Sequence, residues 1–215
     1  MFYHLFPGLS DIHILFNVFR YITFRAAGAV VTSLLIAFVF GPIVIRRLRL
    51  ANVGQVVRAV GPETHLVKAG TPTMGGLLII MSAVLSTLLW ADLTNPYTII
   101  AIVSLLWMGA IGFLDDYLKV VQGKTRGLVA KYKMVGQWTF GLALGAFLVL
   151  NPISPHPATA TAVPFFSGLQ ATFAPIVFVV FTGIVVSGSS NAVNLTDGLD
   201  GLAAGLTAIS AVTLG

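Results

Sequence analysis

The sequence contains no cysteine among its 215 residues. Disulfide bonds and thiolate metal sites are therefore excluded, although this absence says little about the cellular compartment. Charged residues are also scarce, at 9% of the chain, whereas ordinary soluble domains have roughly a quarter. The first twenty residues have neither a basic start nor a small-residue cleavage pattern, so no cleavable signal peptide is indicated. The scarcity of charge excludes an ordinary soluble protein.

Long apolar segments take the place of charge. Hydrophobic residues make up 57% of the chain, and a membrane-spanning helix needs about 20 of them in succession. Five segments approach or exceed this length: 24–45, 73–90, 97–114, 134–150 and 173–187. A sixth begins near Gly201. We therefore predict an all-α polytopic transmembrane helix bundle of about six spans. It would form a single integral membrane domain over residues 1–215 that is truncated within its sixth span.

The basic residues predict the orientation of the chain in the membrane. Of the twelve Lys and Arg residues, five lie between the first and second predicted spans and five between the third and fourth. The connections 91–96 and 151–172 have none. The positive-inside rule then places the two basic loops in the cytoplasm and the N-terminus outside. Four of the seven acidic residues, Asp115, Asp116, Asp197 and Asp200, fall at the same cytoplasmic face.

The stretch "NAVNLTDGLDGLAAG", residues 191–205, places four polar residues at steps of three: Asn191, Asn194, Asp197 and Asp200. On one straight helix the first and last would point in opposite directions, because each step turns about 300°. With Gly198 and Gly201 interrupting it, we predict a helix end, a turn and a new helix start, with the polar groups converging on a pocket. The alternative is that Asn194 and Asp197 merely cap helix ends.

The stretch "GFLDDYLKV", residues 112–120, carries an acidic pair. On a helix Lys119 is four residues after Asp115 and three after Asp116, so one ammonium group can contact both carboxylates. Such a pair can divide the roles of base or nucleophile and of metal or proton holder. An ordinary solvated helix end is the alternative. A carboxylate inside a membrane costs about 2.5 to 3.5 kcal/mol on insertion scales, which favours a function.

The loop 54–76 carries Arg58, His65 and Lys68 and ends in a glycine-rich turn. Basic side chains beside glycine suit phosphate groups, although such loops also serve only topology or contact anionic lipid. Magnesium binds one or two carboxylates together with phosphate oxygens. Acids and bases at one membrane face therefore indicate phosphoryl transfer.

Six segments in order strengthen this interpretation: "FNVFRYITFRA", "GQVVRAVGPETHLVKAGTPTMGG", "GFLDDYLKV", "RGLVAKYK", "VPFF" and "NAVNLTDGLDGLA". Over nearly its whole length the sequence resembles the MraY family of the polyprenyl-phosphate N-acetylhexosamine-1-phosphate transferase superfamily. The resemblance implies transfer of phospho-N-acetylmuramoyl-pentapeptide from UDP-N-acetylmuramoyl-pentapeptide to undecaprenyl phosphate, giving lipid I and UMP. This magnesium-dependent step of peptidoglycan synthesis would occur at the cytoplasmic side of the bacterial cytoplasmic (inner) membrane.

The resemblance also implies roles for individual residues. It implies a catalytic group of Asp115, Asp116 and Asp197, and it makes Asp116 and Asn194 ligands of Mg²⁺, with a further aspartate ligand beyond residue 215. The implied substrate-binding residues are Lys68, Lys119, Lys131, Lys133, Asn191, Asn194, Gly198, Leu199 and Asp200. Complete family members have about ten spans, so residues 1–215 alone are expected to be inactive.

Several alternatives stay open. A related transferase of N-acetylglucosamine phosphate shares the acidic pair, and a membrane transporter with a carboxylate relay also uses intramembrane acids. An inactive fragment that only binds cell-wall partners is a third alternative. Gly141 and Gly145 form a small-xxx-small pattern, which predicts close helix packing within the chain and leaves a homodimer possible. Besides its substrates and the lipid bilayer no partner is implied, and no nucleic acid.

Overall fold

The computed structural model describes residues 1–50, 74–120, 127–153, 159–163, 166, 168–197 and 201–214. These residues form helices almost throughout, apart from one small β-hairpin. They divide into two units, residues 1–129 and residues 130–215. The all-α class is thereby confirmed, whereas the assignment of the whole chain to one domain stays a prediction.

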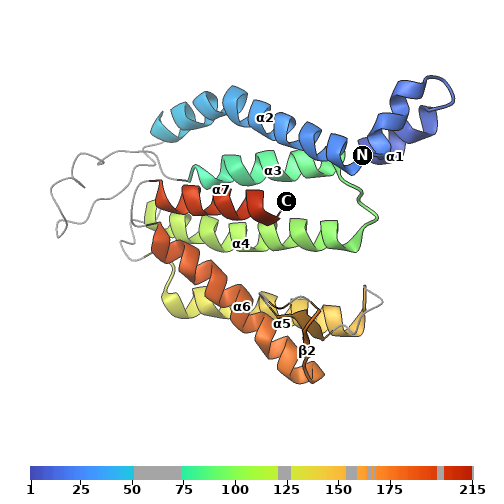
Figure 1. Cartoon of the computed structure of the whole chain (residues 1–215). Coiled ribbons are helices and arrows are strands. Elements are labelled where there is room, and N and C mark those ends of the chain that lie inside the picture. Colours follow the sequence, from blue (N-terminus) through green and yellow to red (C-terminus); the bar gives the residue numbers. More distant parts are fainter. Residues whose placement is uncertain are drawn as a thin grey trace. The chain divides into compact units, whose positions relative to one another are not determined.

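The first unit has three long helices: α2 (Ile22–Leu50), α3 (Gly76–Trp90) and α4 (Pro96–Val120). Within it α3 lies beside both α2 and α4 (Figure 1). α2 continues past residue 45, the predicted end of its apolar segment, and its last turn carries Arg47 and Arg49. Cations at a helix C-terminus interact favourably with the helix dipole, and their long stems remain compatible with an apolar surface.

Short helical turns precede α2: α1 (Phe2–Leu5), η1 (Phe6–Leu9) and η2 (Ile14–Arg20). They are joined to the long helices by an aromatic cluster of Phe2, Phe6, Phe16, Phe19, Phe24 and Trp90. The Trp90 ring is part of this cluster, and its Nε1 also donates to Thr32 Oγ1 at 2.9 Å. Gly28 leaves room for this ring, since a Cβ there would lie 2.5 Å from Trp90 atoms.

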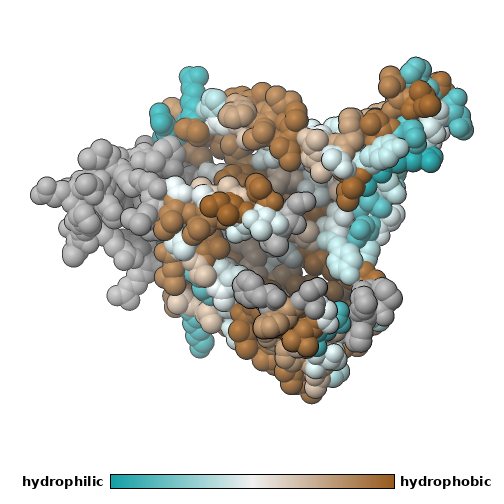
Figure 2. Space-filling view, in the orientation of Figure 1, coloured by the Kyte–Doolittle hydropathy of each residue, from teal (hydrophilic) through white to brown (hydrophobic). Residues whose placement is uncertain are grey.

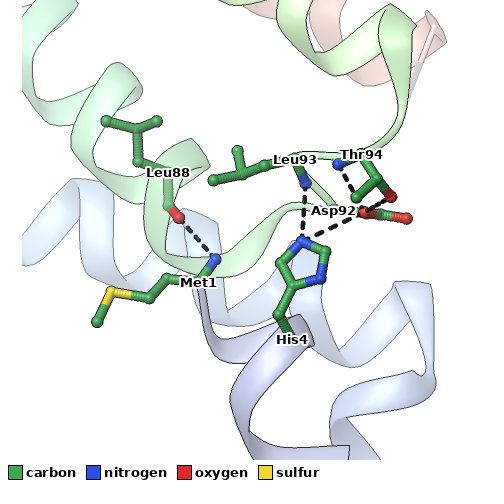
Figure 3. Close-up of polar contacts among 6 residues, drawn as sticks. All are labelled: Met1, His4, Leu88, Asp92, Leu93 and Thr94. Atoms are coloured by element: carbon green, nitrogen blue, oxygen red, sulfur yellow. Dashed lines mark hydrogen bonds and ion pairs between the residues drawn. The ribbon is translucent and has the colours of Figure 1, made fainter.

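Polar contacts accompany the aromatic cluster at the turn 91–95 between α3 and α4 (Figure 3). His4 Nε2 accepts from the backbone N–H of Leu93 at 3.3 Å and lies 3.4 Å from Asp92 Oδ1. The same carboxylate oxygen accepts from Thr94 Oγ1 at 2.6 Å and from Thr94 N–H at 2.9 Å. The hydroxyl of Thr94 is the main reason why the pKa of Asp92 lies below its ordinary value. This turn is therefore held by hydrogen bonds within itself and by a contact with His4 of α1.

The second unit contains α5 (Ala130–Leu150), α6 (Pro175–Thr196) and α7 (Leu202–Leu214). α5 and α6 pack at glycines, because a Cβ on Gly141 would lie 2.7 Å from Gly183 Cα and one on Gly145 2.9 Å from Val179 Cα. Such close approach is typical of membrane helices with small residues at the contact. The predicted packing of Gly141 and Gly145 within the chain is confirmed.

A β-hairpin lies in the long connection between α5 and α6. β1 (Ala160–Ala162) and β2 (Gln170–Thr172) are antiparallel, with Ala160 opposite Thr172 and Thr161 opposite Ala171. Their two strands lie in the uncharged segment 151–172 that was predicted to be an outer loop. The hairpin contains the only β-strands among the described residues.

Long apolar helices dominate both units. Among the described residues, α2, α4, α5 and α6 are long and apolar enough to cross a membrane, and the helices Gly76–Trp90 and Leu202–Thr213 are shorter but apolar. Each of the six predicted spans thus coincides with an apolar helix. Their outer side chains are largely exposed and hydrophobic, as the brown surface over α2 in Figure 2 shows. This surface fits a protein whose helices are surrounded by lipid.

Candidate functional site

The end of α4 carries the acidic pair Asp115 and Asp116 on the same helical surface as Lys119. Lys119 Nζ donates to Asp115 Oδ2 at 2.6 Å and lies 4.0 Å from Asp116 Oδ1. Because α4 continues to Val120, the i,i+4 and i,i+3 spacings bring one ammonium group to both carboxylates. This is the arrangement that the sequence predicts.

The surroundings of the two carboxylates differ. The Asp115 side chain is only 10% exposed, whereas the side chain of Asp116 is 39% exposed. The second oxygen of Asp115, Oδ1, accepts from the backbone N–H of Leu128 at 2.8 Å. Both Asp115 oxygens therefore have donors, as a buried carboxylate requires.

Gly127 allows the chain to return to Asp115 at this point. Its φ is +63°, a left-handed conformation that glycine adopts readily, and a Cβ there would lie 2.5 Å from Asp115 Oδ1. A side chain on residue 127 would thus collide with the carboxylate that Leu128 holds. The sequence analysis did not single out Gly127 or Leu128, because a contact across thirteen residues has no periodic signal.

Asp116 has the chemistry of a magnesium ligand. Its carboxylate is half-buried at a helix end, and Mg²⁺ takes hard oxygen ligands from one or two carboxylates while keeping water or phosphate oxygens. Asp115 is the more deeply buried of the two, and its oxygens accept from Lys119 and Leu128. No group of three or more His, Asp or Glu side chains that could hold a metal occurs among the described residues. This end of α4 would contribute one protein carboxylate to a Mg²⁺ site.

The end of α6 carries the second predicted group. α6 ends at Thr196, Asp197 is its C-cap residue, Gly201 has a φ of +80°, and α7 begins at Leu202. The predicted sequence of helix end, turn and new helix start is confirmed. The capping alternative applies by position to Asp197, whereas Asn194 lies inside α6.

The predicted site residues Asn191, Asn194 and Asp197 at the end of α6 differ in their surroundings. Asn191 Nδ2 donates to Gln137 Oε1 of α5 and to the Ser187 carbonyl oxygen, both at 2.8 Å. Asn194 and Asp197 are exposed. The amide of Asn191 therefore holds α6 to α5, while the next two polar groups lie at the surface of the second unit.

The other predicted site residues fall into two sets. Lys131 and Lys133 lie in the first turn of α5, where Lys131 is exposed and Lys133 half-buried. Lys68, Gly198, Leu199 and Asp200 lie outside the described residues. The site roles of all these residues, and the convergence of the α4 and α6 ends on one pocket, stay predictions.

Gln137 is a residue that the sequence analysis missed. It is 4% exposed and hydrogen-bonded to Asn191 and Ser190 of α6. A lone glutamine in an apolar segment is the signal that could have revealed it, since polar groups inside membrane helices need partners.

Comparison with known proteins defines the class to which this membrane helix bundle belongs. Residues 97–215 match the family described as "Glycosyl transferase family 4". They include both the acidic pair of α4 and the polar end of α6. The chain therefore belongs to glycosyl transferase family 4.

A narrower match falls in the N-terminal half. Residues 68–80 match "Phospho-N-acetylmuramoyl-pentapeptide-transferase signature 1". Proteins named phospho-N-acetylmuramoyl-pentapeptide-transferase are similar over the whole chain: that of Endomicrobium trichonymphae is 52% identical over 214 residues and that of Gemmatimonas aurantiaca 49% identical over 223. That of Citrifermentans bemidjiense is 46% identical over 213 residues, which is 99% of this chain. These findings confirm the resemblance to the MraY family.

The chain is shorter than these relatives. It spans 59% of the length of the Endomicrobium trichonymphae and Gemmatimonas aurantiaca proteins and 58% of that of Citrifermentans bemidjiense.

Proposed function

We propose that the chain belongs to a transferase that moves phospho-N-acetylmuramoyl-pentapeptide from UDP-N-acetylmuramoyl-pentapeptide to undecaprenyl phosphate, giving lipid I and UMP. The names of its relatives and the signature at residues 68–80 support this transferred group. The observation that carries the proposal is the cluster of Asp115, Asp116 and Lys119 at the end of α4. Carboxylates with a shared ammonium group suit reactions of phosphate groups.

In the proposed reaction an oxygen of the lipid phosphate bonds to the phosphorus that carries the sugar. The bond between that phosphorus and UMP breaks, and UMP leaves. One carboxylate of the Asp115–Asp116 pair takes the proton of the lipid phosphate, while Lys119 offsets the negative charge of the pair. Lys68, Lys131 and Lys133 bind the diphosphate, and Asn191, Asn194, Gly198, Leu199 and Asp200 line the nucleotide pocket beside Asp197.

Magnesium has a defined place in this proposal. Asp116 and Asn194 would hold Mg²⁺, since both offer oxygen donors, at a half-buried and an exposed position respectively. When bound, the ion offsets the charge of the diphosphate.

The proposed setting is the bacterial cytoplasmic (inner) membrane with the α4 end facing the cytoplasm. Arg46, Arg47 and Arg49 near the end of α2 and Lys119 at the end of α4 support this orientation. The turn 91–95 has no Lys or Arg, which suits the outer side. The N-terminus is then outside as well.

Magnesium-dependent UMP release tests the function. It is measured in detergent with the product of the full reading frame that encodes this chain, using undecaprenyl phosphate and either UDP-N-acetylmuramoyl-pentapeptide or UDP-N-acetylglucosamine. We expect release with the first donor, little with the second, and none when magnesium is chelated.

Other results would change the proposal. Preference for UDP-N-acetylglucosamine would make the protein a sister transferase, and the absence of release from a folded protein would contradict transferase activity. A transporter would bind no nucleotide, so calorimetric titration with UMP separates that alternative from the transferase.

A further inference from the structure

Gln137 is the centre of a buried hydrogen-bond network between α5 and α6. Its Oε1 accepts from Asn191 Nδ2 at 2.8 Å and from Ser187 Oγ at 3.3 Å. Its Nε2 donates to Ser190 Oγ at 3.0 Å. We call Gln137, Ser187, Ser190 and Asn191 the Gln137 network. Both ends of one amide thus contact the neighbouring helix.

The Gln137 network bears on the rotation and register of α6 against α5, which glycine packing leaves open. Gly141 and Gly145 bring the backbones of α5 and α6 together. Contacts between small groups are not directional, whereas hydrogen bonds require particular donor and acceptor positions. Helices in lipid also gain little from hydrophobic burial against one another, so polar contacts weigh more in their arrangement. The network therefore sets the rotation and register of α6 against α5.

The rotation of α6 matters because its last turn follows the network directly. Asn194 is three residues after Asn191, on nearly the same helical face, and the helix ends at Thr196. A rotation of α6 at Asn191 would redirect the Asn194 amide and the carboxylate of Asp197. Buried amides that lose their partners are penalised, so the network resists such rotation.

We propose that Gln137 is a positioning residue, which orients the end of α6 and thereby the side chains of Asn194 and Asp197. This proposal rests on the proposed function, in which those two residues act at the reaction site. Gln137 itself touches no substrate and acts through Asn191 and Ser190.

Spin labels on the 215-residue chain test the structural half of the proposal. The chain has no cysteine, so two introduced cysteines carry the labels alone. Tyr132→Cys on α5 and Leu195→Cys on α6 are suitable because both native side chains are exposed. We expect Gln137→Leu to shift or broaden the distance distribution between the labels. Thr139→Val is the matched control, since Thr139 Oγ1 donates within its own helix to the Val135 carbonyl oxygen.

UMP release by the product of the full reading frame, without labels, tests the functional half. A misplacement of about 1 Å can reduce a rate about a hundredfold, so we expect Gln137→Leu to lose between about tenfold and a hundredfold in kcat/KM. Ser190→Ala removes one partner of Gln137 and should move distances and turnover in the same direction by a smaller amount. Thr139→Val should leave both unchanged.

Two results would overturn the proposal. Wild-type distances in Gln137→Leu would show that glycine packing alone orients α6, and changed distances with unchanged turnover would show that the α6 end does not act in the reaction. If Gln137→Leu fails to fold, unchanged distances in Ser190→Ala overturn the proposal and shifted ones support it. If the wild type releases no UMP, the proposed function fails, while the distances still decide whether Gln137 orients α6.

Discussion

The two ends of α4 hold acidic residues in opposite circumstances. Asp92, just before the helix, has a side chain that is 25% exposed, and Thr94, two residues further on, donates to it from both its backbone N–H and its hydroxyl. Asp115, near the end of the helix, is only 10% exposed and accepts from Lys119 and from Leu128, thirteen residues away. Asp92 thus takes its hydrogen bonds from its own turn and lies beside His4, whereas the more deeply buried Asp115 also accepts from a segment that returns to it.

This difference supports the proposed catalytic role of the Asp115 end of α4. Local turn contacts such as those of Asp92 form in many proteins without a function. A buried carboxylate is costly in a membrane protein and is retained where it serves a purpose. The following substitutions test this contrast, beginning with the largest expected effect.

Breaking the side-chain contact of the acid at each end should have unequal consequences. Lys119→Met leaves Asp115 buried without its ammonium partner and should destabilise the protein by about 1–3 kcal/mol, less than for a fully buried pair because Lys119 is 43% exposed. His4→Ala removes a partly exposed side chain that accepts from Leu93 and lies beside Asp92, and it should cost about 1 kcal/mol or less. Thermal unfolding in detergent measures both.

Lys119→Arg is the control for the charge itself. It keeps a cation beside the acidic pair and should recover most of the lost stability. Equal losses for Lys119→Met and His4→Ala would show that the two ends do not differ as described.

Gly127→Ala should affect the Asp115 end by displacing its carboxylate. The new Cβ would lie 2.5 Å from Asp115 Oδ1, on a backbone with a φ of +63°. We expect a loss of activity of about tenfold or more, because small misplacements of a reacting group are costly. Gly168→Ala is matched in having a positive φ of +83° but no atom within 4 Å of the new Cβ. It should keep full turnover, and equal losses in both variants would assign the effect to the backbone alone.

Gly28→Ala should loosen the packing around Trp90 without disturbing the acidic pair Asp115 and Asp116. The new Cβ would lie 2.5 Å from Trp90 ring atoms, so the ring must move away from Thr32. Overpacking of this kind costs about 1–3 kcal/mol. Gly8→Ala is the control, because a Cβ at residue 8 would have no atom within 4 Å, and its unfolding midpoint should stay near that of the wild type. Turnover per folded molecule should stay near that of the wild type in both variants.

The smallest expected effect is the pH dependence of the stability that Asp92 contributes. Its pKa is lowered in the folded protein, chiefly by the Thr94 hydroxyl. The stabilisation is therefore fully present above the unfolded-state value near 3.8 and is lost as the pH falls through the lower folded-state pKa. As the pH is lowered from about 5 to about 2, the thermal unfolding midpoint should fall less in Asp92→Asn than in the wild type. If the unfolding midpoints of the two proteins change equally with pH, the Thr94–Asp92 contact does not stabilise the folded protein.

Local patterns explain why much of this molecule could be predicted. Apolar segment length indicated the six helices, and the i,i+4 spacing indicated the contact between Asp115 and Lys119. Glycines after Asp197 indicated the break between α6 and α7. Each of these features depends on residues close together in the sequence.

Contacts between distant segments could not be predicted in the same way. The return of Leu128 to Asp115 and the pairing of Gln137 with Asn191 join positions 13 and 54 residues apart. The aromatic cluster around Trp90 likewise gathers rings from the N-terminal turns and two helices without regular spacing. Such contacts follow from how the elements pack, which a single sequence does not encode in a readable pattern.

The most direct test of the account compares Asp116→Asn with Asp92→Asn in magnesium-dependent UMP release by the product of the full reading frame. Both variants remove one negative charge, at opposite ends of α4. If the acidic pair is the catalytic end, Asp116→Asn loses about a hundredfold or more in kcat and Asp92→Asn keeps the wild-type rate. Equal rates in the two folded variants would contradict that claim.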